Sequence, residues 1–522
     1  MASLNNKVNF NKCETVENHC GEEVFKLNAL ETLFSKVLGS FFGESTFYEE
    51  RSVGSDFENT VKLLSEVPEK DIEYILKLAV LGRRYGMISY PLALLTACFN
   101  DKRFKGNVFC DENGKGKIRK YSKDIVLRGK DITDVLAMQL VMYGREKIPM
   151  QLRRELKNRL ESFNEYKISK ALGKGKLVSM SDAIKMLHPN PNRSKVSAKF
   201  FKDVIEDRVK FGAGVKQIQN ELSRSPKDSS DNLDGIIESV ETSSLLALLK
   251  NLSSLAKRDV FKDLKVAEKV ASRFKNREEV LRSKILPFRF YSAYICLRDD
   301  TYRDGVDVVY EAVEEALENS IENLEDIEGH NAILVDVSGS MTYPVSEYSK
   351  VTAKDIALLL GAICYKKGNS DLYVFGNRCS KVTASRKSSL MDIVNLAKSF
   401  NVGGASYLKE ALQHINKVSK GYDNLIILSD SDCYNPVYYG RPFSFSMGAD
   451  SYADSLLNKG FFKRIYLNNL LGNDFSAVNV NNYRKNLIVG FSEKIVTTIN
   501  MYEELGSGNK DIRVIIDSLY NS

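Results

Sequence analysis

A short stretch near the middle of the chain combines a buried-strand pattern with oxygen-bearing side chains. It runs from Asn331 to Met341, N-A-I-L-V-D-V-S-G-S-M, with apolar residues on both sides of one aspartate. A continuous apolar run of this length predicts a strand buried in a parallel sheet. Asp336, Ser338 and Ser340 follow at alternate positions and offer one carboxylate and two hydroxyls. Such ligands suit a hard cation such as Mg²⁺, which takes few protein ligands and keeps several waters.

This D-x-S-x-S pattern resembles the metal-ion-dependent adhesion site of von Willebrand factor A domains. The resemblance implies that Asp430, in the S-D-S-D that follows the apolar run L-I-I-L, also serves the cation. It also implies a contact from the loop N-V-G-G-A-S-Y-L, where the family has a threonine. Alignment on the glycines places Ala405 there, which cannot ligate, whereas alignment on the following helix places Ser406 there. We favour Ser406, and the departure from threonine leaves this contact open. In such domains a partner's carboxylate completes the coordination, which is a binding role and not a catalytic one.

The elements that must position these residues alternate between strand and helix from residue 331 onward, which predicts an α/β doubly wound, Rossmann-like domain over 326–522. Taken alone, Asp430 could be a helix cap, and Asp432 is an additional carboxylate nearby. In an open parallel sheet, however, ligands bind outside the carboxyl ends of the strands. Because three polar loops are expected at that edge, we predict a divalent cation there. The predicted strands are 331–335, 371–375, 425–428, 465–470 and 486–491, with helices at 351–365, 389–400 and 512–520.

The composition is that of an ordinary globular protein of more than one domain. The chain has 522 residues, 43% hydrophobic and 27% charged, too many for a single core. It contains no apolar run long enough to predict a membrane span, and its first residues lack the apolar core of a signal peptide. The eight cysteines are scattered, which is typical of reduced thiols. We therefore expect a cytoplasmic protein without membrane contact that acts as a monomer.

The basic charge is concentrated in one region. Residues 101–224 carry 29 Lys or Arg against 15 Asp or Glu, whereas the rest of the chain carries 46 basic and 53 acidic residues. Such asymmetry is the footprint expected of a polyanion-binding surface, although charge runs in general are more often a solvated face. The alternative is a well-solvated helical face with no partner.

The first part of the chain has a helical pattern with scarcely a strand. Residues 1–24 are polar and predict a flexible N-terminal arm, with a loosely docked tail as the alternative. Apolar residues then recur at spacings of three and four, and short loops separate helices of ten to fifteen residues. This pattern predicts stacked helix pairs over 25–325. Ser181 is the expected N-cap of a helix that His188 and Pro189 end.

Five pieces of this helical part resemble the TROVE module, which is named for telomerase, Ro and vault proteins. They are I-P-x-x-L-R-R-x-L (148–156), Y-K-I-S-K-A (166–171), S-D-A-I-K-M-L-H-P-N-P (181–191), L-A-L-L-K-N-L (246–252) and L-P-F-R (286–289). In proteins of the Ro type this module precedes a von Willebrand factor A domain, as the order of patterns does here. The resemblance implies a ring of HEAT-like helical repeats followed by that domain.

The resemblance further implies RNA as the partner. In Ro proteins the hole of the ring accepts single-stranded RNA ends, and the basic outer surface binds duplex RNA, including Y RNAs. Lys170 and His188 match positions that touch RNA in the family. Local charge alone adds seven further candidates, which are Arg145, Arg153, Arg154, Lys174, Lys176, Arg193 and Lys195. Basic side chains neutralise phosphates, and an imidazole ring can stack on a base.

Three classes of function fit these patterns. The first, which we favour, is a non-enzymatic protein that binds small non-coding or misfolded RNA and recruits an exoribonuclease or another protein through its cation site. The second is a metal-dependent RNA-processing enzyme using Asp336, Asp430 and Asp432. The third is a protein-binding scaffold whose basic surface is incidental. No Ser-His-Asp arrangement, phosphate-binding P-loop or C-x-x-C pair supports another enzyme class.

Overall fold

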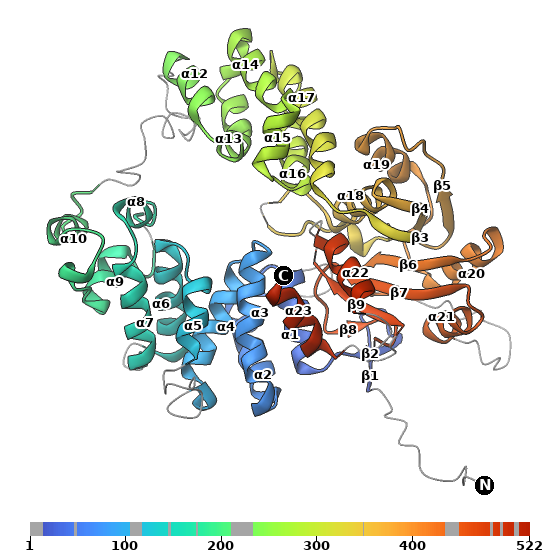
Figure 1. Cartoon of the computed structure of the whole chain (residues 1–522), viewed down its shortest axis with the longest axis horizontal. Coiled ribbons are helices and arrows are strands. Elements are labelled where there is room, and N and C mark those ends of the chain that lie inside the picture. The colour runs from blue at the N-terminus through green and yellow to red at the C-terminus, as the bar shows by residue number, and fades with distance from the viewer. Residues whose placement is uncertain are drawn as a thin grey trace, which may run out of the picture.

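The chain folds into a helical part and an α/β part (Figure 1). The structure is a computed structural model, and it describes residues 14–45, 50–104, 117–144, 148–173, 176–209, 233–347, 349–433, 448–480, 484–490, 494–505 and 511–522. Within these ranges no helix is long and apolar enough to cross a membrane.

The first group of helices packs as a series in which neighbours along the chain lie side by side. α3 packs on α4, α4 on α6, and α6 on α9. Nearly every side chain of α4 is buried, because this apolar helix lies inside the series. The group contains α1 (Ala29–Gly39), α2 (Val53–Glu66), α3 (Ile72–Arg84), α4 (Ser89–Asn100), α5 (Ile118–Ile125), α6 (Gly129–Tyr143), α7 (Met150–Glu161), α8 (Glu165–Ser169), α9 (Met180–Leu187) and α10 (Ala198–Ile205).

A second group of helices leads to the α/β part. α14 packs on α12 and α17, and α16 packs on α13 and α17. Glu318, near the end of α17, pairs with Lys366 and accepts a hydrogen bond from the backbone N–H of Leu390 at 2.7 Å. These contacts fix the second group against the α/β part. The group contains α12 (Leu233–Thr242), α13 (Leu245–Lys257), α14 (Leu264–Lys275), α15 (Arg277–Ser283), α16 (Pro287–Arg298) and α17 (Val306–Ser320).

The α/β part is built on a six-stranded sheet in the order β5-β4-β3-β6-β7-β9. All neighbours in this sheet are parallel except β5, which pairs antiparallel with β4 at one edge. The strands are β3 (Ile327–Asp336), β4 (Gly368–Phe375), β5 (Cys379–Val382), β6 (Tyr422–Ser429), β7 (Phe462–Asn469) and β9 (Lys485–Val489). The helices are α18 (Ala353–Lys366), α19 (Leu390–Ser399), α20 (Leu408–Val418), α21 (Ala449–Asn458), α22 (Lys494–Glu504) and α23 (Ile512–Asn521).

Alternate residues of β3 enter two different cores, as the two-residue period of a strand requires. Ile333 and Val335 pack in the core that contains α18 and α19, whereas Ala332 and Leu334 pack in the core that contains α20 and α21. The sheet is therefore covered on both faces, and every predicted strand of this part is present. The predicted fold class, a helical HEAT-like ring followed by a doubly wound α/β domain, is confirmed.

The two ends of the chain cross between the parts. α23 packs on α3 of the first helical group. At the other end, β1 (Thr15–Glu17) and β2 (Glu23–Lys26) form a hairpin, and β2 pairs with β8 (Phe475–Ser476) of the α/β part. The prediction of a flexible arm over 1–24 is therefore wrong for residues 14–24, because the hairpin obtains its third strand from far along the chain. Residues 1–13 lie outside the described residues.

One helix begins earlier than predicted. The side chain of Ser179, not that of Ser181, accepts the backbone N–H of Asp182 at the start of α9. Asp182 returns the interaction by accepting the N–H of Ser179, so the two form a capping box. His188 ends the helix in a left-handed conformation with φ of 49°, where the prediction placed the end.

Candidate cation site and nucleic-acid surface

The first loop of the candidate cation site follows β3 directly. Asp336 is fully buried, and its Oδ1 accepts the backbone N–H of Ser338 at 2.9 Å. The hydroxyls of Ser338 and Ser340 lie 3.3 Å apart, so the alternate spacing brings both to one side of the loop. This loop therefore presents two hydroxyls beside one carboxylate.

The second loop places a serine against this carboxylate. The Oγ of Ser406 donates to Oδ2 of Asp336 at 2.8 Å, whereas the backbone N–H of Ala405 donates to the Asn377 side chain. The N–H of Gly339 donates to the carbonyl of Gly404 at 2.7 Å, which joins the first two loops. Of the two residues considered for this loop, Ser406 lies at the site.

The third loop follows β6, the strand next to β3. Asp430 is fully buried, and its Oδ1 accepts the N–H of Asp432 at 3.0 Å. Its Oδ2 is buried without a hydrogen-bond partner. Asp430 caps no helix among the described residues. A buried carboxylate oxygen without a donor is costly, and a cation is the kind of ligand that would satisfy it.

Ser429, the last residue of β6, is a residue of this site that the sequence patterns missed. Its Oγ donates to Oδ2 of Asp336 at 2.7 Å. Asp336 thus accepts three hydrogen bonds, from Ser338, Ser406 and Ser429, which fix the orientation of its carboxylate. The last residue of a strand is usually assigned a structural role. The sequence therefore indicated Ser429 only through its hydroxyl at the start of S-D-S-D.

Asp336 and Asp430 lie in surroundings that disfavour the ionised form of a carboxyl group. Burial raises the pKa of Asp336, although hydrogen bonds from Ser338, Ser429 and Ser406 oppose the rise. Burial, followed by the charges of Asp336 and Asp432, raises the pKa of Asp430 to about 7. A bound divalent cation would relieve this repulsion, because an opposite charge favours the ionised form.

The donor set fits a hard cation. Two carboxylates and the hydroxyls of Ser338, Ser340 and Ser406 supply only oxygen atoms, as Mg²⁺ prefers. Among the described residues no group of three or more His, Cys, Asp or Glu side chains is placed to hold a metal ion. A cation here would therefore rely on the hydroxyls and on water as well as on Asp336 and Asp430.

The basic candidates lie on or beside three short helices of the first group. Glu161, at the end of α7, accepts the N–H of Asn190 through its side chain at 2.7 Å and the N–H of Lys195 through its carbonyl at 3.0 Å. The segment after His188 is therefore held against α7. Seven candidates have exposed side chains and are called the basic set, namely Arg153, Arg154, Lys170, Lys176, His188, Arg193 and Lys195. Arg145 and Lys174 lie outside the described residues.

Lys170 lies next to an aromatic ring. Its Nζ is 4.6 Å from the ring centroid of Tyr166, one turn earlier in the chain. A cation beside a half-buried aromatic ring offers both charge for a phosphate and a surface for a base. Tyr166 was not among the predicted site residues, although it lies in the same Y-K-I-S-K-A piece.

A helical series followed by a parallel-sheet domain with a D-x-S-x-S loop is the arrangement expected from the resemblance to proteins of the Ro type. The sequence profile of the TROVE domain family matches residues 234–304, which include α13 to α16 and two of the five pieces recognised in the sequence. A search of curated protein sequences finds no match.

The solved structure of the Ro (RSR) protein from Deinococcus radiodurans has the same fold. It matches with a TM-score of 0.61 and 14% identity, over 94% of this chain and 99% of that one. Two further solved structures match only part of the chain. Proximal thread matrix protein 1 of the mussel byssus matches with a TM-score of 0.22 and 12% identity, over 39% of this chain and 53% of that one. A mutant PilB minor pilin of Streptococcus sanguinis matches with a TM-score of 0.21 and 14% identity, over 38% of this chain and 64% of that one. Residues 234–304 thus match the TROVE domain family, and the chain as a whole has the fold of this Ro protein.

Proposed function

We propose that this chain is a cytoplasmic RNA-binding protein of the Ro type that binds small non-coding or misfolded RNA without cleaving it. The observation that carries the proposal is the exposed basic set on α7, α8 and α9 and their loops, within a TROVE-type helical fold. Exposed Lys and Arg side chains bind phosphates and release counterions, so the affinity would fall as salt rises.

Single-stranded RNA would enter the helical ring by its 3′ end, while a flanking duplex would lie on the basic set. Lys170 with Tyr166, and His188 at the end of α9, supply a cation and rings that could stack on unpaired bases. This mode tolerates many sequences, which suits a protein that binds small RNAs or presents misfolded ones.

The α/β domain would bind one Mg²⁺ through Asp336, Ser338, Ser340, Ser406 and Asp430. Thr342, Tyr343 and Pro344 follow Ser340 and are exposed, so a protein partner could contact them at the rim of the site. A carboxylate of that partner, for example of an exoribonuclease, would complete the coordination. The domain would thereby join a bound RNA to a second protein.

Binding of a small structured RNA with a free 3′ tail tests the proposal. The full chain is compared with Lys170→Ala plus His188→Ala, and with Lys417→Ala plus Lys459→Ala as a matched control of two exposed lysines on the α/β domain. We expect salt-sensitive binding that is about tenfold weaker or more in the first variant and unchanged in the control. Wild-type binding no tighter than roughly micromolar at physiological salt would contradict RNA binding and favour the scaffold alternative.

A further inference from the structure

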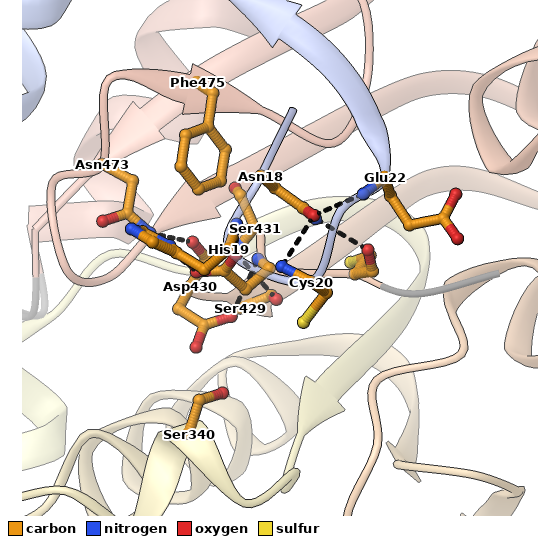
Figure 2. A network of polar contacts seen from close by, with 12 residues as sticks. Asn18, His19, Cys20, Glu22, Ser340, Ser429, Asp430, Ser431, Asn473 and Phe475 are labelled. Atoms are coloured by element: carbon orange, nitrogen blue, oxygen red, sulfur yellow. Dashed lines mark hydrogen bonds and ion pairs between the residues drawn. The ribbon is translucent and has the colours of Figure 1, made fainter. Parts of the chain in front are cut away.

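The turn between β1 and β2 inserts beside the third loop of the candidate cation site (Figure 2). Asn18 is buried at this turn, and its side-chain oxygen accepts the backbone N–H groups of Cys20 at 3.0 Å and Glu22 at 2.9 Å. Its amide nitrogen donates to the backbone carbonyl of Cys433 at 2.8 Å. One side chain therefore shapes the turn and attaches it to the loop that carries Asp430.

His19 engages both carboxylate oxygens of Asp432. The backbone N–H of His19 donates to Oδ1 at 3.1 Å, and Nδ1 lies 2.9 Å from Oδ2. An ionised Asp432 can only accept, so Nδ1 is the donor in that contact. The imidazole packs edge-on against the ring of Phe475 in β8, with 5.6 Å between the ring centroids, and this contact fixes its orientation.

A third contact holds the backbone of the same loop. The side chain of Asn473 donates to the carbonyl of Asp430 at 2.7 Å, and the backbone carbonyl of Asn473 accepts the Ser35 hydroxyl at 3.0 Å. In the view of Figure 2, Asp430 lies between His19 and Ser340 of the first loop. The Asp430–Cys433 loop is thus held by the N-terminal turn and by Asn473, and Ser35 of α1 in turn holds Asn473.

We propose that Asn18 and His19 are positioning residues of the cation site, which hold the Asp430–Cys433 loop so that Asp430 faces the cation and Asp432 is directed away from it. This inference rests on the proposed cation site. Within the described part of the chain the three carboxylates of Asp336, Asp430 and Asp432 do not form a group that could hold a metal ion.

Residues that orient metal ligands through hydrogen bonds change affinity strongly. Removing such a partner typically weakens metal binding by roughly 10- to 100-fold. Without the His19 ring, Oδ2 of Asp432 loses its 2.9 Å contact and retains the longer contact, at 3.5 Å, with the side-chain amide of Asn473. The loop that carries Asp430 would then sample other conformations. The cation would bind only the conformation in which Asp430 faces it, so its affinity would fall.

The test titrates the full-length chain with Mn²⁺ as the probe and follows free Mn²⁺ by electron paramagnetic resonance, with melting curves in EDTA as a check on folding. His19→Ala removes the ring and its donor. His19→Phe keeps an aromatic ring against Phe475 and removes the donor, whereas His19→Asn places an amide N–H where Nδ1 lies. Glu17→Ala is the matched control, because Glu17 is exposed on the same hairpin.

We expect His19→Ala and His19→Phe to bind Mn²⁺ about tenfold more weakly than wild type, with His19→Asn and Glu17→Ala within about threefold of it. If His19→Ala also melts at a lower temperature in EDTA, the Mn²⁺ affinities of His19→Phe and His19→Asn test the positioning role in its place. Equal affinity in all variants, or tighter binding without His19, would overturn the positioning role while leaving the cation site intact. A wild-type chain that binds no Mn²⁺ would overturn the cation site itself.

Discussion

The hydroxyl of Ser406 lies 2.8 Å from Oδ2 of Asp336, from a loop 70 residues further along the chain. Both residues are buried, so this contact is shielded from water. It joins the loop after β3 to the loop before α20 and places a hydroxyl against the Asp336 carboxylate.

Ser406 should therefore be replaceable only by a residue with a hydroxyl. Ser406→Thr retains the donor to Asp336 and should bind Mn²⁺ within about threefold of wild type. Ser406→Ala removes it and should weaken binding by about tenfold or more, by the reasoning that applies to groups orienting a ligand. Calorimetric titration with Mn²⁺ compares the two, and equal affinities would remove Ser406 from the site.

The two aspartates of the third loop should differ in effect. Asp430→Asn removes a charge whose oxygen has no other partner, so cation binding should fall by more than about 100-fold. Asp432→Asn disturbs the contact with His19 from the other side, so binding should fall by about tenfold, as in His19→Phe. Mn²⁺ titration of both variants at one pH makes the comparison. A larger loss in Asp432→Asn would show that the wrong aspartate has been assigned to the cation.

Stability without a divalent cation should fall as pH rises. The pKa of Asp430 is raised to about 7, above the value near 4 of an aspartate in an unfolded chain. The folded state therefore holds more protons than the unfolded state between about pH 4 and 7, and the free energy of unfolding decreases with pH across this window. Saturating Mg²⁺ should abolish that decrease, because it favours ionised Asp430.

Melting temperatures measured from about pH 5 to 8, in EDTA and in Mg²⁺, check this prediction. Asp430→Asn serves as the control, since it has no carboxyl to titrate and should show a smaller pH dependence in EDTA. A wild-type protein whose stability in EDTA rises steadily over this range would contradict it.

Much of the α/β domain could be predicted because its signals are local. The apolar runs of β3 and β6 are long, and the polar residues of D-x-S-x-S and S-D-S-D follow them directly. Topology then brings both loops to one edge of the sheet. Ser406 could be selected over Ala405 because the following helix fixes the spacing.

The N-terminal hairpin could not be predicted, because its stability comes from contacts far away in the sequence. β1 and β2 are three and four residues long, too short for a period-two pattern, and their partner β8 has two residues. Asn18 and His19 therefore looked like polar residues of a tail. Only the folded chain places them beside Asp432 and Cys433.

The number of phosphate contacts should be visible in the salt dependence of RNA binding. Substituting Arg193 and Lys195 by alanine removes two exposed cations from the segment after His188. Each lost phosphate contact should reduce the slope of log K against log salt by about 1 and weaken binding to all sequences similarly. Filter binding at several salt concentrations measures the slope. An unchanged slope would exclude these two residues from the RNA surface.

The most direct test of RNA-end binding by the ring compares one RNA duplex with and without a single-stranded 3′ tail. If the ring accepts an RNA end, the tail should strengthen binding by about tenfold or more, since each stacked base contributes roughly 1–3 kcal/mol. The advantage should be lost in Lys170→Ala plus His188→Ala and retained in Lys417→Ala plus Lys459→Ala. Equal affinity for tailed and blunt RNA, measured on the wild-type chain at physiological salt, would contradict the proposal that this protein binds RNA by its end.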